Sequence, residues 1–172
     1  MVADGPSLEV TAVSPRWLSP EEQSSWRAWV AASTLLPHRL SKDLQQDAQI
    51  TLADYEILMY LSESPCRRMR MSELAEATLS SRSRLSHQVD RLAAAGFIDR
   101  QPCPDDRRGS FAVLTEAGWS MVVQTAPAHV ESVRQHLVDV LSPEEFSELG
   151  RLCELIALRL REPQEECPGD TT

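Results

Sequence analysis

The sequence predicts a mainly α-helical protein with one small β-hairpin, and three observations between residues 71 and 114 support this. Two serine-capped segments separated by a tight turn around Leu79 predict a helix-turn-helix. Gly96 follows the second segment and supplies a C-terminal stop. Two short apolar runs then flank a turn of proline, aspartate and glycine, whose tip carries adjacent arginines. Together these elements predict a winged helix-turn-helix, in which the hairpin is the wing.

The N-terminal part of the chain predicts an arm followed by one long helix. Residues 1–18 lack hydrophobic periodicity and are expected to form a loose arm. Ser19, Pro20 and Glu22 form a capping-box pattern that starts a helix within residues 19–50. Pro37 is expected to kink that helix or to end its first segment.

The helix-turn-helix lies in a predicted lobe of residues 51–114. Thr51 caps a helix that ends near residues 64–65, and Ser72 is expected to cap a short helix to about Thr78. Ser80 or Ser81 then caps a second helix that runs to about residue 95. Its apolar residues recur at helical spacing and predict a buried stripe made of Leu85, Val89 and Leu92. Its opposite face carries groups that reach base edges and phosphates: Ser83, Arg84, Ser86, His87, Asp90 and Arg91.

The C-terminal part predicts two helices within residues 115–162 and a disordered tail over residues 163–172. Thr115 caps a helix to about Val140, with Pro127 expected to bend it, and Ser142 caps the last helix. The first of these would span roughly 35–40 Å, more than the small winged module can cover. Its apolar stripe therefore predicts a homodimer with recognition helices about 34 Å apart, one DNA turn. The alternative is a monomer whose terminal helices fold back onto its own lobe.

The segment resembles the DNA-binding core of the MarR (multiple-antibiotic-resistance regulator) family of bacterial transcription factors. The resemblance covers Leu52 to about Leu160. It is carried by four groups of residues: 86–92, 96–98, 106–108, and Leu114–Thr115 with Gly118. Two positions depart from the family's wing signature, because Cys103 replaces an aspartate and Ala112 replaces a valine.

The resemblance implies a homodimeric repressor of a palindromic operator that a small aromatic or phenolic ligand releases. It also implies that Asp106 orders the wing while Arg108 enters the minor groove. The complete expected DNA-binding set is Arg70, Ser80, Ser83, Arg84, Ser86, His87, Gln88, Arg91, Asp106, Arg107 and Arg108. Gln88 lies off the centre of the outward face. The effector pocket is expected between the dimer helices and the lobe, near Trp29, His38, Arg39, Tyr55 and Met59.

The charge distribution is compatible with DNA despite a net charge of −9. Residues 66–108 contain nine arginines against six acidic residues, or +3, so the remainder carries −12. A local basic surface on an acidic body still binds phosphates through local contacts. No signal peptide or membrane-length apolar run is present, which predicts a soluble, cytoplasmic protein.

The sequence also leaves room for other classes of function. Cys103 near the wing arginines would suit a redox sensor if its thiol were exposed. A winged helix used only for protein contacts is a further alternative. Neither a metal nor a cofactor is expected, since the four cysteines lack C-x-x-C spacing and His129 and His136 are about 10 Å apart along a helix. The absence of nucleophile-elbow, metalloprotease, P-loop and dinucleotide motifs predicts that the chain is not an enzyme.

Overall fold

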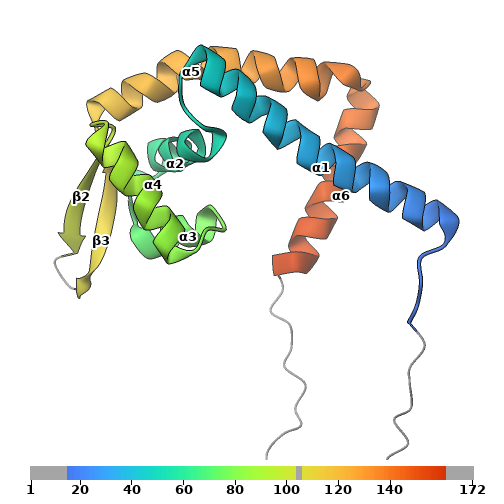
Figure 1. Ribbon diagram of the computed structural model, residues 1–172, viewed down its shortest axis with the longest axis horizontal. Coiled ribbons are helices and arrows are strands. Elements are labelled where there is room, and N and C mark those ends of the chain that lie inside the picture. Colours follow the sequence, from blue (N-terminus) through green and yellow to red (C-terminus); the bar gives the residue numbers. More distant parts are fainter. Residues whose placement is uncertain (1–14, 104–105, 162–172) are drawn as a thin grey trace, which may run out of the picture. The chain divides into compact units, whose positions relative to one another are not determined.

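The computed structural model describes residues 15–103 and 106–161, and between 106 and 108 it describes the backbone only. The chain divides into two units at Leu35–Leu36, and the second unit contains the elements of the candidate site. Figure 1 labels the main elements. In chain order they are α1 (Pro20–Asp47), α2 (Leu52–Glu63), a 3₁₀ turn (Pro65–Arg67), β1 (Arg68–Arg70), α3 (Met71–Ala77), α4 (Arg82–Ala94), β2 (Ile98–Cys103), β3 (Asp106–Leu114), α5 (Glu116–His136), a 3₁₀ turn (Val138–Val140) and α6 (Pro143–Arg161).

The predicted fold class is confirmed, with one more strand than expected. The sheet is antiparallel in the order β1-β3-β2, and β2 and β3 form the predicted hairpin (Figure 1). β1 pairs with β3, with Arg68 opposite Val113 and Arg70 opposite Phe111. The sequence predicts a loop with exposed arginines for this segment instead. Three residues with two charged side chains give no alternation long enough to predict a strand.

Most helix starts are capped as the sequence predicts. Ser19 and Glu22 form a reciprocal capping box, with N–H···O distances of 2.8 and 3.2 Å. Ser142 and Glu145 repeat this arrangement at α6, also at 2.8 and 3.2 Å. Single hydroxyl caps start the other long helices of the chain: Thr51 at α2, Ser81 at α4 and Thr115 at α5.

Two expected helix boundaries are wrong. α3 starts at Met71, because the N–H of Arg70 donates to the Glu73 carboxylate at 3.2 Å, so Ser72 lies inside the helix. α5 ends at His136, and a separate 3₁₀ turn covers Val138–Val140. Of the two outcomes expected for Pro37, the end of a first segment is wrong, because α1 continues to Asp47. The kink at Pro37 and the bend at Pro127 stay predictions.

The hydrophobic core lies mainly in residues 51–114, here called the winged lobe. The predicted stripe of Leu85, Val89 and Leu92 is buried and packs with residues of α2, α3 and the sheet. In contrast, α6 contains no buried residue in the described chain. The described helices include none with the length and hydrophobicity that crossing a membrane requires.

Gly118 fixes the junction between the wing and α5. A Cβ on this residue would lie 2.2 Å from the carbonyl oxygen of Phe97 and 2.6 Å from Cδ1 of Leu114. The Thr115 hydroxyl donates to the Gly96 carbonyl at 2.7 Å and accepts the N–H of Gly118 at 3.0 Å. The start of α5 is therefore held directly against the turn between α4 and β2.

Candidate nucleic-acid interface

The second helix of the helix-turn-helix, α4, presents a polar face to solvent. Ser81 ends the turn, and its hydroxyl accepts the backbone N–H of Arg84 at 3.3 Å. The Arg84 side chain is exposed. Ser83 and His87 are also exposed, as the sequence predicts. These side chains supply hydrogen-bond donors and acceptors along one face, the requirement for contact with base edges and phosphates.

Gln88 does not belong to this exposed face, so its expected contact with DNA is corrected. The residue is only 7 % exposed, and its Oε1 has no hydrogen-bond partner among the residues that the structure describes. It lies three residues after Leu85 and four before Leu92, so helical geometry places it beside the buried stripe. A side chain in this position supports packing rather than recognition.

Arg91 is engaged within the protein. Its Nη2 donates to both carboxylate oxygens of Asp54 in α2, at 2.7 and 2.9 Å. Asp54 is buried, whereas the Arg91 side chain keeps 61 % of its accessible surface. The expected contact with DNA therefore competes with an ion pair that joins α4 to α2.

Arg100 connects the wing to α4, and sequence reasoning did not identify it. From β2 its Nη2 reaches the carbonyl and the hydroxyl of Ser86 at 3.1 and 2.9 Å, and the carboxylate of Asp90 at 2.9 Å. The Ser86 hydroxyl, expected to bind DNA, thus already accepts an internal hydrogen bond. Sequence spacing cannot show this contact, because it depends on how the hairpin packs against the helix.

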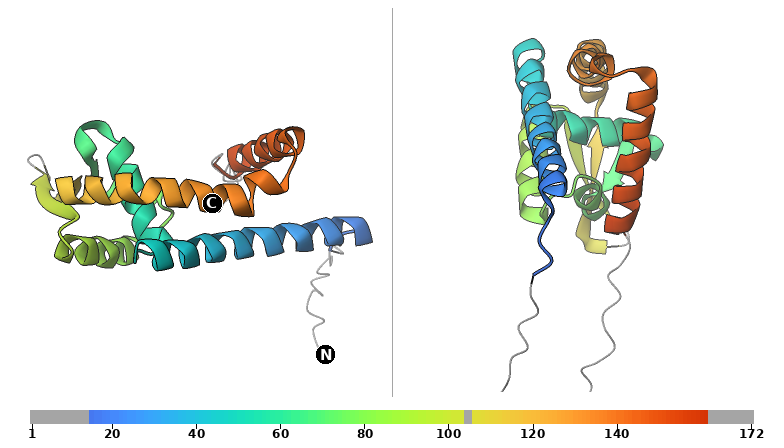
Figure 2. Two further views of the ribbon diagram at one scale, coloured as in Figure 1. Left: turned by 90° about the horizontal axis from the view of Figure 1, so that it is seen from above. Right: turned by 90° about the vertical axis from the view of Figure 1, so that its right-hand side faces the viewer.

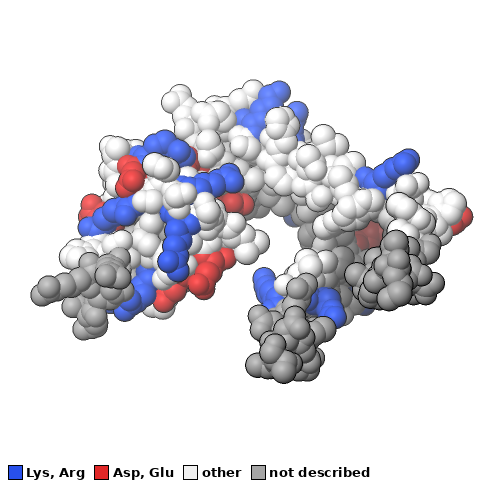
Figure 3. Space-filling view, turned by 60° about the horizontal axis from the view of Figure 1, so that its bottom comes forward, with Lys and Arg blue, Asp and Glu red and all other residues white. Residues whose placement is uncertain are grey.

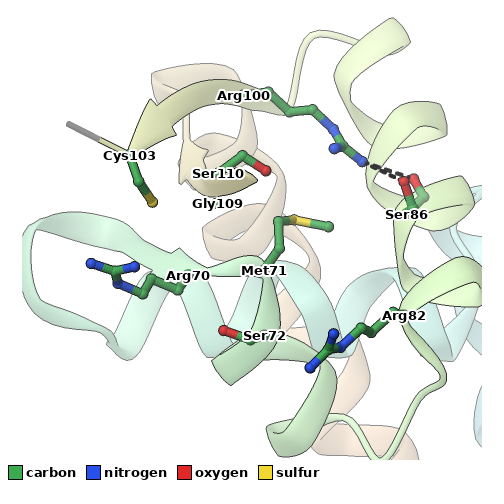
Figure 4. Close-up of a pocket in the computed structure, with 9 residues that line it drawn as sticks. All are labelled: Arg70, Met71, Ser72, Arg82, Ser86, Arg100, Cys103, Gly109 and Ser110. Carbon is green, nitrogen blue, oxygen red and sulfur yellow. Dashed lines mark hydrogen bonds between the residues drawn. The ribbon is translucent and has the colours of Figure 1, made fainter. Parts of the chain in front are cut away.

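A pocket of about 390 Å³ opens between α4, the start of α3 and the strands of the wing (Figure 4). Figure 4 shows Arg82 extending from α4 toward the α3 side, near Ser72. Neither residue belongs to the DNA-binding set expected from the sequence. The residues that line the pocket are Arg70, Met71, Ser72, Arg82, Ser86, Arg100, Cys103, Gly109 and Ser110. Three guanidiniums and three serine hydroxyls make its lining suited to an anionic group such as a phosphate.

The arginines before α3 have different surroundings. Arg68 and Arg70 lie 4.9 and 5.3 Å from the ring centre of Phe111 in β3. Arg67 lies 4.2 Å from the Trp119 ring and pairs with Glu116 at 3.0 Å. Arg67 therefore contacts α5 and helps to hold it in position, whereas Arg70 lines the edge of the pocket. Figure 3 shows basic side chains spread over the winged lobe with acidic ones among them.

The wing residues of the predicted site are described only in part. Residues 106–108 belong to β3, but the side chains of Asp106, Arg107 and Arg108 lie outside the described part of the structure. Their roles remain predictions. Ser80 is half-buried, and its hydroxyl donates to the Thr78 carbonyl at 3.4 Å.

Comparison with known proteins agrees with this architecture. The sequence profile of the MarR family matches residues 48–109, which cover most of the winged lobe. AbsC, a MarR family transcriptional regulator from Streptomyces coelicolor, is 50 % identical over 86 % of this chain and 99 % of its own, with a TM-score of 0.80. This chain belongs to the MarR family.

Other MarR family members extend the comparison. Sco3205 from Streptomyces coelicolor, whose structure was solved in complex with DNA, is 45 % identical over 91 % of this chain and 97 % of its own, with a TM-score of 0.82. The transcriptional regulator PecS from Dickeya dadantii is 27 % identical over 82 % of this chain and 85 % of its own. This chain is therefore similar to regulators over nearly their whole length.

The five residues expected to form a MarR-type effector pocket are not brought together within the described second unit. Tyr55 is buried in the core, where its ring meets that of His129 edge to face at 5.0 Å. Met59 lines a separate surface pocket, and His38 is exposed. Arg39 lies beside Asp43 and His136. Trp29 belongs to the first unit and is exposed.

The structure argues against the redox alternative. Cys103 is only 4 % exposed, whereas a sensing thiol must meet its oxidant.

The described residues contain no group of three or more histidine, cysteine or acidic side chains that could hold a metal ion.

Proposed function

We propose that this MarR family protein binds double-stranded DNA as a homodimer and represses transcription from a palindromic operator. A small molecule would release it. One observation carries the proposal: α4 exposes Ser83, Arg84 and His87 on the face opposite a fully buried stripe. Helices of this kind enter the major groove in helix-turn-helix proteins.

The surroundings of α4 support a wide contact with the DNA backbone. The pocket with Arg70, Arg82 and Arg100 lies between α4 and the wing, where a phosphate strand would pass if α4 entered the groove. The wing arginines, Arg107 and Arg108, follow in sequence and would reach the adjacent minor groove. The DNA complex of Sco3205 supports extending this role to the present chain.

The terminal helices support the proposed homodimer. α6 buries none of its residues within the described chain, yet it carries a series of large apolar side chains that are at least one-third exposed. These residues are Phe146, Leu152, Leu155, Ile156, Leu158 and Leu160. An exposed apolar face of this kind marks an interaction surface, and a second copy of the chain is the partner that would also pair two recognition helices.

Selection of binding sites from random duplex DNA, followed by affinity measured against salt, tests the proposal. We expect a palindrome with half-sites about one helical turn apart and an affinity that falls steeply with salt. Sedimentation should give a dimer. Absence of an enriched site, with weak binding that does not depend on salt, would instead favour a protein-interaction module and reject the proposed function.

A further inference from the structure

Polar side chains join the C-terminal turns of α1 to the C-terminal half of α5 within the second unit, and this contact is here called the polar seam. Figure 2 shows the backbone of this end of α1 beside α5. Asp43 is the central residue of the polar seam. Its Oδ2 accepts a hydrogen bond from the Ser132 hydroxyl at 2.7 Å and lies 2.9 Å from Nε2 of His136. Arg39 approaches the other carboxylate oxygen, Oδ1, at 3.4 Å.

The seam contains a cavity of about 330 Å³. It is lined by Asp43, Leu44, Asp47, Ala48, Met121, Gln124, Thr125, Ala128, His129 and Ser132. A neighbouring cavity of about 250 Å³ shares Asp43, Asp47, Ala128 and Ser132 with it, so the two form one continuous trough. The volume of the larger one lies within the range of about 300–1,000 Å³ that is usual for small-molecule sites.

The lining of the larger cavity is negatively charged. It includes two carboxylates, one turn apart on α1, and neither lysine nor arginine. Asp43 stays ionised, because the Ser132 hydrogen bond lowers the pKa of its carboxyl group. Asp47 is exposed and has no hydrogen bond or ion pair with any residue that the structure describes. Arg39 lines only the neighbouring cavity and already approaches Asp43.

His129 adds a neutral ring to this lining. Burial lowers the pKa of its imidazole below the ordinary value of 6.5, so the ring contributes no positive charge near pH 7. Its Nδ1 is buried without a hydrogen-bond partner among the described residues. A buried nitrogen of this kind favours a ligand or water that supplies the missing hydrogen bond.

We propose that the trough between α1 and α5 binds a small organic cation, such as a primary amine carried on a compact apolar body. The ammonium would pair with Asp47 and Asp43, and the body would lie against Leu44, Ala48 and Met121. An aromatic carboxylate would instead bring a third negative charge beside these two carboxylates. This inference rests on the proposed function, because it assigns the ligand class of the effector.

The trough is connected to the DNA-binding helix through packed residues. α1 leads into α2 through residues 48–51 alone, and His129 contacts Tyr55 of α2. α2 in turn holds α4 through the ion pair between Asp54 and Arg91. A ligand that separates α1 from α5 therefore shifts the helix against which α4 is held.

Three probes of similar size but different charge test the ligand class: benzylamine, benzyl alcohol and benzoate, at constant ionic strength. The full-length protein is followed by its thermal midpoint without DNA and by release from its selected operator. We expect benzylamine to raise the midpoint and to release the operator, and benzoate to do neither. Asp47→Asn should raise the benzylamine concentration for half-maximal response at least about tenfold, while Glu63→Gln, on α2 outside the trough, should not.

Each contrary outcome overturns the inference. If benzoate acts as well as benzylamine, the ligand need not be a cation. If Asp47→Asn responds to benzylamine as the wild type does, the trough is not the binding site. A change in the oligomeric mass of ligand-free Asp47→Asn would show that the seam contacts a second copy instead. The proposed function fails separately, if the wild-type protein without any probe selects no operator, because the thermal measurement does not involve DNA.

Discussion

Arg91 of α4 and Asp54 of α2 form a two-point ion pair, with Nη2 2.7 and 2.9 Å from the carboxylate oxygens. Asp54 is the third residue of α2, in the first turn, where the N-terminus of the helix also favours a carboxylate. The pair therefore sets where the end of α4 lies on α2. Arg91, which was expected to contact DNA, therefore helps to hold the recognition helix α4 in its orientation.

Replacing Arg91 should destabilise the protein in the absence of DNA. Arg91→Ala leaves the buried Asp54 carboxylate without its partner, which costs about 1–3 kcal/mol of the free energy of unfolding. Urea unfolding measures this loss. In the double variant Asp54→Asn with Arg91→Ala, part of the stability should return, because the buried charge is gone. Full stability of Arg91→Ala together with lost operator binding would show that the side chain serves DNA alone.

Arg84 should contribute to operator binding without contributing to stability. Its side chain is exposed, and the described hydrogen bonds of this residue involve only its backbone. Arg84→Ala should weaken operator affinity by about 1–3 kcal/mol, roughly 5- to 150-fold, with an unchanged thermal midpoint. Arg151→Ala is the matched control, because Arg151 is exposed on α6 and pairs with Glu148. Equal operator affinity for the two variants would remove Arg84 from the interface.

Local patterns predicted the fold well, because the features that determine it are local. Caps at Ser19, Thr51, Thr115 and Ser142 depend on hydrogen bonds that span three residues, and these all form. β1 was not predicted, because its hydrogen bonds join residues more than forty positions apart in the sequence. The start of α3 was misplaced for a related reason, since Arg70 both ends β1 and caps α3.

The candidate site was predicted less completely than the fold. Periodicity identified the exposed face of α4 but cannot tell whether a charged side chain there meets solvent or another element. Arg91 and Ser86 both have partners on other elements, Asp54 and Arg100. Arg82 and Ser72 were missed, because their common pocket exists only when α3, α4 and the wing are packed together.

Arg100 should couple the wing to α4. Arg100→Ala removes the contacts to Ser86 and Asp90, so the wing loses its fixed angle to the recognition helix. We expect operator affinity to fall about tenfold and the free energy of unfolding to fall by only about 1–2 kcal/mol. Hydrogen exchange of the β2 backbone should rise in the variant. Unchanged exchange and affinity would mean that the hairpin holds its position without this side chain.

Gly118 and Gly150 should respond in opposite directions to the same substitution. Gly118→Ala places a Cβ 2.2 Å from the Phe97 carbonyl oxygen, and this overpacking costs about 1–3 kcal/mol. Gly150 lies inside α6 with nothing within 4 Å of the added atom, so Gly150→Ala should stabilise the helix by about 0.5–1 kcal/mol. Thermal unfolding of both variants checks the pair. Stabilisation by Gly118→Ala would mean that the junction of α5 with the wing is looser than described.

His129 should make the protein less stable in mild acid. Burial lowers the pKa of the folded imidazole below the value of 6.5 that applies to the unfolded chain, so the unfolded state binds more protons between these two values. The contribution of neutral His129 to the free energy of unfolding is therefore fully present above pH 6.5. It is lost as the pH falls toward the lowered pKa.

The wild-type thermal midpoint should drop between pH 7.5 and 5.5, and His129→Gln should reduce that drop. The pKa of Asp43 is lowered from 3.8, so this carboxyl group affects stability only in more acidic solution and does not disturb the comparison. His129→Gln also removes the ring contact with Tyr55, so the variant is expected to have a lower midpoint at pH 7.5. The informative quantity is therefore the slope with pH rather than the midpoint itself. An identical slope in both proteins would show that His129 is as easily protonated in the folded state as in the unfolded state.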